Sequence, residues 1–157
     1  MRTALFLAFL LAALGFAIWR GGGPERAMAA IALAMVGADA LLHHYLPVEF
    51  AMLDMGHLAL DLAGVAFTTA LALCAYRFWP MIAAVLHFLP LLAHTSRILD
   101  VTLNPAAYLT MQVAASWLVP PLLILATWRH QRRLRQRGND PSWHVWWRAS
   151  NPTARGS

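Results

Sequence analysis

The chain has 157 residues, which is enough for one domain. Hydrophobic residues make up 60% of it and charged residues only 12%, whereas a soluble domain carries about 25% charged residues, so the composition excludes an ordinary soluble enzyme and favours a membrane protein. The formal charge is +5 with no lysine, and the single cysteine, Cys74, excludes an internal disulfide and a CxxC metal or redox site.

Five apolar stretches are long enough to cross a membrane, which takes a helix of about 17–25 mostly apolar residues. In chain order they are residues 3–19, 27–46, 55–78, 80–99 and 105–128. The sequence therefore predicts an all-α integral membrane bundle of five transmembrane helices. Residues 1–128 form its transmembrane domain, and residues 129–157 form a basic, tryptophan-rich tail.

Glycine, proline and polar residues mark where these helices begin and end. Residues 20–26 (RGGGPER) are too polar to continue the first span. Pro80 fits the first turn of the fourth helix, where its missing N–H costs nothing, and Asn104 fits the N-cap of the fifth. The last two spans also contain internal prolines, which neighbouring helices allow a membrane helix to tolerate. These are Pro90, Pro120 and Pro121.

The arginines indicate which end of each helix faces the cytoplasm, because arginine and lysine accumulate in cytoplasmic loops. With the N-terminus outside, most arginines fall inside and the acidic loop residues fall outside. The inner set is Arg20, Arg26, Arg77 and the cluster at residues 129–137; the outer set is Arg2, Arg97, Glu49, Asp54 and Asp100. The sequence thus predicts an outside N-terminus and a cytoplasmic tail.

The first span also fits a secretory signal peptide, with Arg2, an apolar run and Gly15-Phe16-Ala17 as the cleavage site. Cleavage would leave four spans with both ends outside. The arginine cluster would then face outward if Arg20 and Arg26 did. We therefore expect the first span to be retained.

Ionisable side chains inside the predicted spans are the strongest functional signal, because each is costly in hydrocarbon. Asp39 and His43 are four residues apart on the second span, and His57 and Asp61 are four apart on the third. Each pair therefore shares a helix face. At 1.5 Å per residue the two pairs lie at matching depth near the outer surface, and His94 of the fourth span falls in the same layer.

Three interpretations of this layer stay open. The first is hydrogen bonding between helices, which stabilises a membrane bundle by roughly 0.6–2 kcal/mol per contact. The second is a transition metal or a b-type haem, with ligands among His43, His57 and His94 and with Asp39 and Asp61 behind them. The third is a proton or ion path, although no polar residues continue it toward the cytoplasm below His87.

The chain contains no complete catalytic motif. Ser96 lies near His94, but it lacks the GxSxG turn of a nucleophilic serine. His87 stands roughly 10 Å from His94 along the helix, so the two cannot bind one iron. His130 and His144 have no acidic residue or second histidine at ligand spacing, so we expect both at the membrane interface. The sequence gives no reason to expect an enzyme.

The first part of the tail is strongly basic. Residues 129–137 are expected to extend the fifth helix into the cytoplasm, where each arginine contributes about 1 kcal/mol to contact with anionic lipid. The membrane tether argues against nucleic acid as a partner. The residues expected at the lipid headgroups are Arg132, Arg133, Arg135 and Arg137.

The second part of the tail is rich in tryptophan. Gly138 is expected to end the fifth helix, and Asp140-Pro141 fits the start of a second, short helix. That helix would place Trp143, Trp146 and Trp147 on one face. Such a face suits either the headgroup layer or a partner protein.

Three short motifs occur in a recognisable order. They are residues 20–26 (RGGGPER), residues 77–80 (RFWP), and residues 94–100 (HTSRILD) followed by Ala107-Tyr108. In this order they resemble a group of small multi-pass proteins of alphaproteobacteria, sphingomonads especially. The resemblance runs from the end of the first span to the fifth. It implies a location in the bacterial inner membrane and makes residues 94–100 a feature of the group, but it implies no activity.

The size, the short loops and the aromatic tail are typical of an accessory subunit or assembly factor of a larger membrane complex, which is the first functional expectation. A haem- or metal-binding membrane protein with a site near the outer face is the second. A small transporter or channel is the third. The expected partners are anionic membrane lipids and other membrane-protein subunits.

Overall fold

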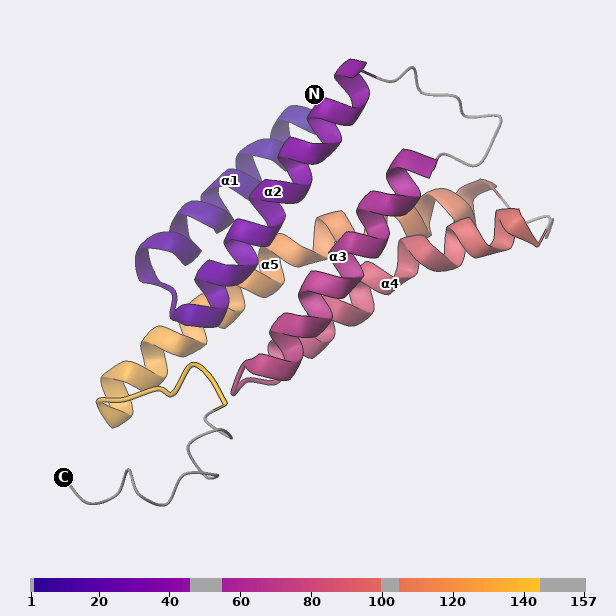
Figure 1. Ribbon diagram of the computed structural model, residues 1–157. Helices are drawn as coiled ribbons and strands as arrows, with labels where there is room; N and C mark the ends of the chain where they lie inside the picture. Colours follow the sequence, from indigo (N-terminus) through magenta and orange to yellow (C-terminus); the bar gives the residue numbers. More distant parts are fainter. Residues whose placement is uncertain (1, 46–54, 100–104, 145–157) are drawn as a thin grey trace.

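The computed structural model describes residues 2–45, 55–99 and 105–144, and these residues form five α-helices (Figure 1). In chain order, α1 is Arg2–Arg20, α2 is Gly23–Tyr45, α3 is Met55–Cys74, α4 is Trp79–Ile98 and α5 is Pro105–Arg137. The predicted all-helical fold is confirmed. Within the described part of the chain, three helical segments are long and apolar enough to cross a membrane: Gly23–Tyr45, Met55–Cys74 and Trp79–Ser96.

Successive helices run antiparallel and pack in a ring (Figure 1). Each helix contacts the next in the chain, α5 returns to contact α1, and α5 also touches α2. The ring therefore has two ends. We call the end that contains Arg20, Arg77 and His130 the arginine end, and the opposite end, with His43 and His57, the histidine end.

The connection between α1 and α2 is shorter than expected, because α2 begins at Gly23 and not at residue 27. Pro24 lies in its first turn, where proline is favoured. The Glu25 carboxylate accepts a hydrogen bond from the Gly22 N–H at 3.1 Å, and the Gly22 carbonyl accepts the first helical bond from Arg26. A glutamate three residues after the N-cap that reaches back in this way satisfies a free N–H and fixes the helix start.

The other boundaries lie close to the predicted ones, except at the ends of the third and fifth spans. α3 stops at Cys74, four residues before the expected end of its span, and residues 75–78 connect it to α4. α5 runs unbroken to Arg137, so residues 129–137 extend the fifth helix as predicted. Gly138 then adopts a φ of 69°, a left-handed conformation that favours glycine just past a helix end.

The chain after Gly138 turns back toward the bundle. The prediction of a second, short helix is wrong for the described part of this segment. Residues 139–144 are not helical. Trp143 instead forms an antiparallel β-bridge with Ala75, in the α3–α4 connection. Trp146 and Trp147, with which it was expected to share a helix face, lie outside the described residues.

The apolar core lies toward the arginine end of the ring. It is made of small and medium side chains, which lets the helices approach closely. Its buried members nearest that end come from all five helices and include Leu14, Ala17, Met28, Ala29, Leu71, Ala83 and Leu123. Toward the histidine end the ring encloses a cavity instead.

Candidate metal centre

Three potential metal ligands converge at the histidine end, two from α2 and one from α3. Asp39, His43 and His57 each offer one ligand atom, and these three atoms lie within 4.8 Å of one another. The Asp39 Oδ1 atom is 3.4 Å from His57 Nε2 and 3.6 Å from His43 Nδ1. The two imidazole rings meet edge to face, with centroids 5.0 Å apart. All three residues belong to the predicted site, with His43 and His57 predicted as ligands and Asp39 predicted as a carboxylate behind them.

The local structure explains how these side chains meet. Asp39 and His43 are one turn apart on α2, so they share a face. α3 approaches that face closely, because a Cβ atom on Gly56 would lie only 2.7 Å from Leu42 Cδ1. His57, the next residue of α3, is thereby brought to the Asp39 carboxylate.

His43 is oriented by its own helix. Its Nδ1 atom is 2.9 Å from the Asp39 backbone carbonyl, which can only accept, so Nδ1 carries the proton and donates. The Nε2 atom of His43 then keeps its lone pair, so His43 would bind a metal through Nε2, whereas the 3.6 Å approach to Asp39 is made by the protonated Nδ1. A backbone carbonyl that fixes the tautomer in this way is a common partner of a metal-binding histidine.

A cavity of about 330 Å³ opens beside the three ligands and is lined by all five helices. Asp39 and His57 belong both to the ligand group and to the cavity wall. The remaining wall is mainly apolar, with polar groups from α3, α4 and α5. These polar lining residues are Asp61, His87 and Ser116.

His94, the third predicted ligand, and Asp61, predicted to stand behind the ligands, form a separate pair. The His94 Nε2 atom is 3.0 Å from Asp61 Oδ2, and the His94 side chain is buried. His87, on the same helix as His94, donates its Nδ1 proton to the Ala83 carbonyl at 2.8 Å, which leaves its Nε2 lone pair free. The five predicted residues thus divide into a group of three and a pair, and Asp61 connects them because it also lines the cavity.

Apolar packing separates the cavity from the arginine end. On α1 the cavity is lined by Phe6 and Leu10, and Leu14 follows one turn later in the buried core. The same order holds on α5, where Val119 lines the cavity and the buried Leu123 follows. In the described residues the cavity is therefore closed on that side.

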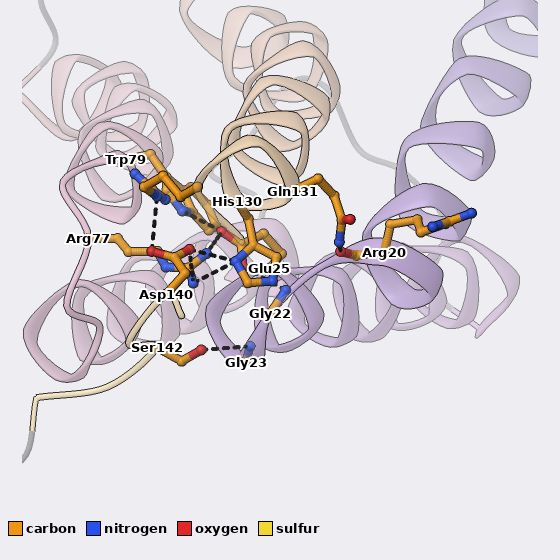
Figure 2. Close-up of polar contacts among 11 residues, drawn as sticks. Arg20, Gly22, Gly23, Glu25, Arg77, Trp79, His130, Gln131, Asp140 and Ser142 are labelled. Atoms are coloured by element: carbon orange, nitrogen blue, oxygen red, sulfur yellow. Dashed lines mark hydrogen bonds and ion pairs between the residues drawn. The ribbon is translucent and has the colours of Figure 1, made fainter. Parts of the chain in front are cut away.

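A second polar cluster, not predicted from the sequence, lies at the arginine end (Figure 2). Its centre is Arg77, whose side chain is 2% exposed between two carboxylates. Arg77 donates through Nη1 to Glu25, which is fully buried, and its Nη2 atom lies 2.8 Å from Asp140 Oδ2. Glu25 also accepts a hydrogen bond from the Trp79 indole N–H at 3.0 Å.

Asp140 joins this network to α5. Its Oδ2 atom is 2.6 Å from His130 Nδ1, and its Oδ1 atom is 3.0 Å from Arg133 Nε. The Nδ1 atom of His130 is also 3.0 Å from Arg77, but it cannot donate to one group and accept from the other. We assign donation to Asp140, the closer partner. His130 was expected at the membrane interface and is instead buried, because Asp140 comes back to meet it.

The returning chain is held by backbone contacts as well. Tyr76 donates to the Ser142 carbonyl at 3.1 Å and His144 donates to the Cys74 carbonyl at 2.9 Å, on either side of the Ala75–Trp143 bridge. We call residues 138–144 the return segment. It covers the α3–α4 connection and the start of α2.

The sequence carried one usable signal for this cluster. Glu25, Arg77 and Asp140 all fall at the same predicted end of the bundle, in a chain with few charges. Two acids among many arginines at one end indicate ion pairing. Asp140 was instead interpreted as a helix cap, which placed it away from Arg77.

Comparison of the chain with protein-family models, with curated proteins and with solved structures finds no match.

Proposed function

We propose that this chain is a small membrane protein that binds a divalent transition-metal ion through Asp39, His43 and His57. The observation that carries the proposal is the convergence of one carboxylate and two imidazoles from two helices, within 4.8 Å, beside a cavity. Imidazole nitrogen suits zinc, copper, iron and nickel, and one carboxylate adds a negative charge that favours a dication.

The number of ligands supports exchangeable binding. Structural zinc sites use four protein ligands, whereas three protein ligands leave a position for water or another molecule. The cavity beside Asp39 and His57 offers space for that position. A metal carrier or metal-handling protein needs such an open site, because the ion must enter and leave.

Haem is less well supported than a metal ion. The His43 and His57 rings are in edge-to-face contact at 5.0 Å between centroids. A porphyrin plane between two axial imidazoles would require these rings to separate. His94, the predicted opposite ligand, is engaged by Asp61 at 3.0 Å.

We also propose that all five helices cross the bacterial inner membrane, with the N-terminus outside. Large apolar side chains are exposed on the outside of the ring, such as Leu5 on α1, Leu73 on α3 and Val85 on α4; a soluble monomer rarely exposes such surface. The arginine end gathers the residues that favour the cytoplasmic side.

A pair of reporter fusions tests this topology. Alkaline phosphatase fused to the C-terminus should be inactive, and a fluorescent protein at the same position should fluoresce. An active phosphatase and a dark fluorescent protein would contradict an odd number of crossings with the N-terminus outside.

Metal titration of the purified protein in mild detergent tests the site. Zn²⁺ and Co²⁺ should bind to the wild type, and His57→Ala and Asp39→Asn should each weaken binding by about 100-fold or more, since even the hydrogen-bond partners of metal ligands contribute about 10–100-fold. His44→Ala is the matched control, because His44 neighbours His43 but contacts the Tyr45 ring and lies outside the ligand group. Equal affinity in His57→Ala and the wild type would refute the site.

A role as an accessory subunit or assembly factor is the second candidate. The observation that favours it is the ordered arginine end, where the return segment presents Trp143 with 38% of its surface exposed. Exposed tryptophan is enriched at protein contacts. Cross-linking in native membranes should capture a defined membrane-protein partner in the wild type and lose it in Trp143→Ala. Capture of the same partner by both proteins would show that the contact lies elsewhere.

A transporter or channel is less well supported, because apolar packing closes the cavity toward the arginine end.

A further inference from the structure

The arginine end carries positive charge that its own acids do not balance. The described acids there, Glu25 and Asp140, are already engaged by Arg77, His130 and Arg133. Several other arginines at this end have no acidic partner among the described residues. They are Arg20, Arg26, Arg129, Arg132, Arg135 and Arg137.

Two of these arginines are stacked on exposed tryptophans. The Arg20 guanidinium carbon lies 4.3 Å from the centroid of the Trp19 ring, and that of Arg132 lies 5.8 Å from the Trp128 ring. Trp19 is 72% and Trp128 52% exposed. A guanidinium over an indole face is held in place by the ring without losing its charge.

The two pairs lie on helix ends that are joined to each other. The Gln131 side-chain amide donates to the Arg20 backbone carbonyl, which fixes the end of α1 against α5. Trp128, Gln131 and Arg132 are spaced i, i+3 and i+4, so they are neighbours on the surface of α5. Figure 2 shows the Arg20 side chain extending away from the Arg77 network, with its guanidinium free of Glu25 and Asp140.

We propose that Trp19, Arg20, Trp128 and Arg132 form a binding site for the headgroup of an anionic phospholipid. The two guanidiniums contact the phosphate, and the two indoles lie at the headgroup level, where tryptophan is favoured in membrane proteins. A lipid is favoured over a free phosphate because Arg20 directly follows the apolar segment of α1, and Arg132 lies about one turn beyond the apolar segment of α5 that ends at Trp128. The site depends on the membrane placement proposed above but not on the metal centre.

The test uses the full-length protein in neutral detergent, with phosphatidylglycerol, phosphatidylcholine of the same chain length, and inorganic phosphate as probes. Native mass spectrometry counts retained lipids and gives an apparent dissociation constant. Phosphatidylglycerol should be retained in preference to phosphatidylcholine. Arg20→Ala and Arg132→Ala should each weaken it by about fivefold, because an arginine near an anionic surface contributes about 1 kcal/mol.

Arg137→Ala is the matched control, because Arg137 is exposed on the same helix but lies five residues further from the bundle. It should change the affinity less than twofold. An equal loss in Arg137→Ala would overturn the site in favour of diffuse attraction by the whole arginine cluster. Equal retention of the two lipids, or stabilisation by inorganic phosphate that matches that by phosphatidylglycerol, would overturn the lipid assignment.

Discussion

Removal of the Arg77 side chain should strongly destabilise the protein. Arg77 and Glu25 are 2% and 0% exposed, so Arg77→Ala leaves the Glu25 carboxylate buried without its cation. The Asp140 carboxylate loses fewer of its partners, because Arg133 and His130 remain 3.0 Å and 2.6 Å from its oxygens. Breaking a buried ion pair by removing one partner costs about 3–5 kcal/mol.

Thermal unfolding of the detergent-solubilised protein measures this loss. For a chain of this size, 1 kcal/mol corresponds to about 2–4 °C in Tm. A cost of about 3–5 kcal/mol for the broken buried pair should therefore lower the apparent Tm of Arg77→Ala by about 6–20 °C. The control is Arg26→Ala, which removes an exposed arginine next to Glu25 and should stay within about 0.5 kcal/mol of the wild type.

A double-mutant cycle separates the ion pair from general damage. Glu25→Gln removes the buried charge that Arg77→Ala leaves uncompensated, so the double variant should be less destabilised than the sum of the single ones. A coupling energy of about 1–3 kcal/mol is expected for two groups in direct contact. A Tm for Arg77→Ala equal to that of Arg26→Ala, or strictly additive effects in the cycle, would refute the buried network.

Two further predictions concern the turn after α1 and the return segment. Gly21→Ala should destabilise the protein by about 1–3 kcal/mol, because the new Cβ atom would lie 2.3 Å from the Ala17 carbonyl oxygen. Gly15→Ala is the control: its Cβ atom would have no neighbour within 4 Å, so it should be neutral or stabilise the protein by up to about 1 kcal/mol. Thermal unfolding compares the two variants, and equal Tm values would contradict the close turn. In a Cys74→Ala background, cysteines replacing Ala75 and Trp143 should form a disulfide on mild oxidation of the purified protein, since facing residues of such a bridge have Cα atoms about 4.5 Å apart. Thiol counting with a maleimide detects the bond, and two free thiols after oxidation would mean that the return segment does not pair with the α3–α4 connection.

The helices follow from the sequence because their causes are local. Long apolar runs form helices in a membrane, where every backbone polar group must be satisfied within its own segment. The contact between Asp39 and His43 is equally local, since residues four apart share a helix face. These features were accordingly predicted with their residues.

The partners across helices depend on how each helix is rotated about its axis, which local sequence does not determine. Asp61 and His57 share a face of α3, yet Asp61 bonds His94 of α4 while His57 meets Asp39 of α2. Matching depth alone left all these pairings possible. The same depth argument placed His94 with His43 and His57, whereas the ligand group contains only Asp39, His43 and His57.

The network at the arginine end was missed because it requires the chain to reverse after α5. Gly138 allows the reversal through its left-handed conformation, and Asp140 then reaches Arg77 and His130. A proline after an aspartate is equally compatible with a helix start, so the local pattern at Asp140-Pro141 favoured a helix. The contacts of Asp140 with Arg77, His130 and Arg133 outweigh that preference in the folded chain.

Metal content is the most direct test of the central claim. The protein is purified in mild detergent without chelators, and its iron, copper, nickel and zinc are measured by mass spectrometry. The proposed site predicts about one transition-metal ion per chain in the wild type and in His44→Ala, and loss of that ion in His57→Ala. A wild-type protein with only trace metal, or a His57→Ala variant with as much metal as the wild type, would contradict it and leave Asp39, His43 and His57 as contacts between helices.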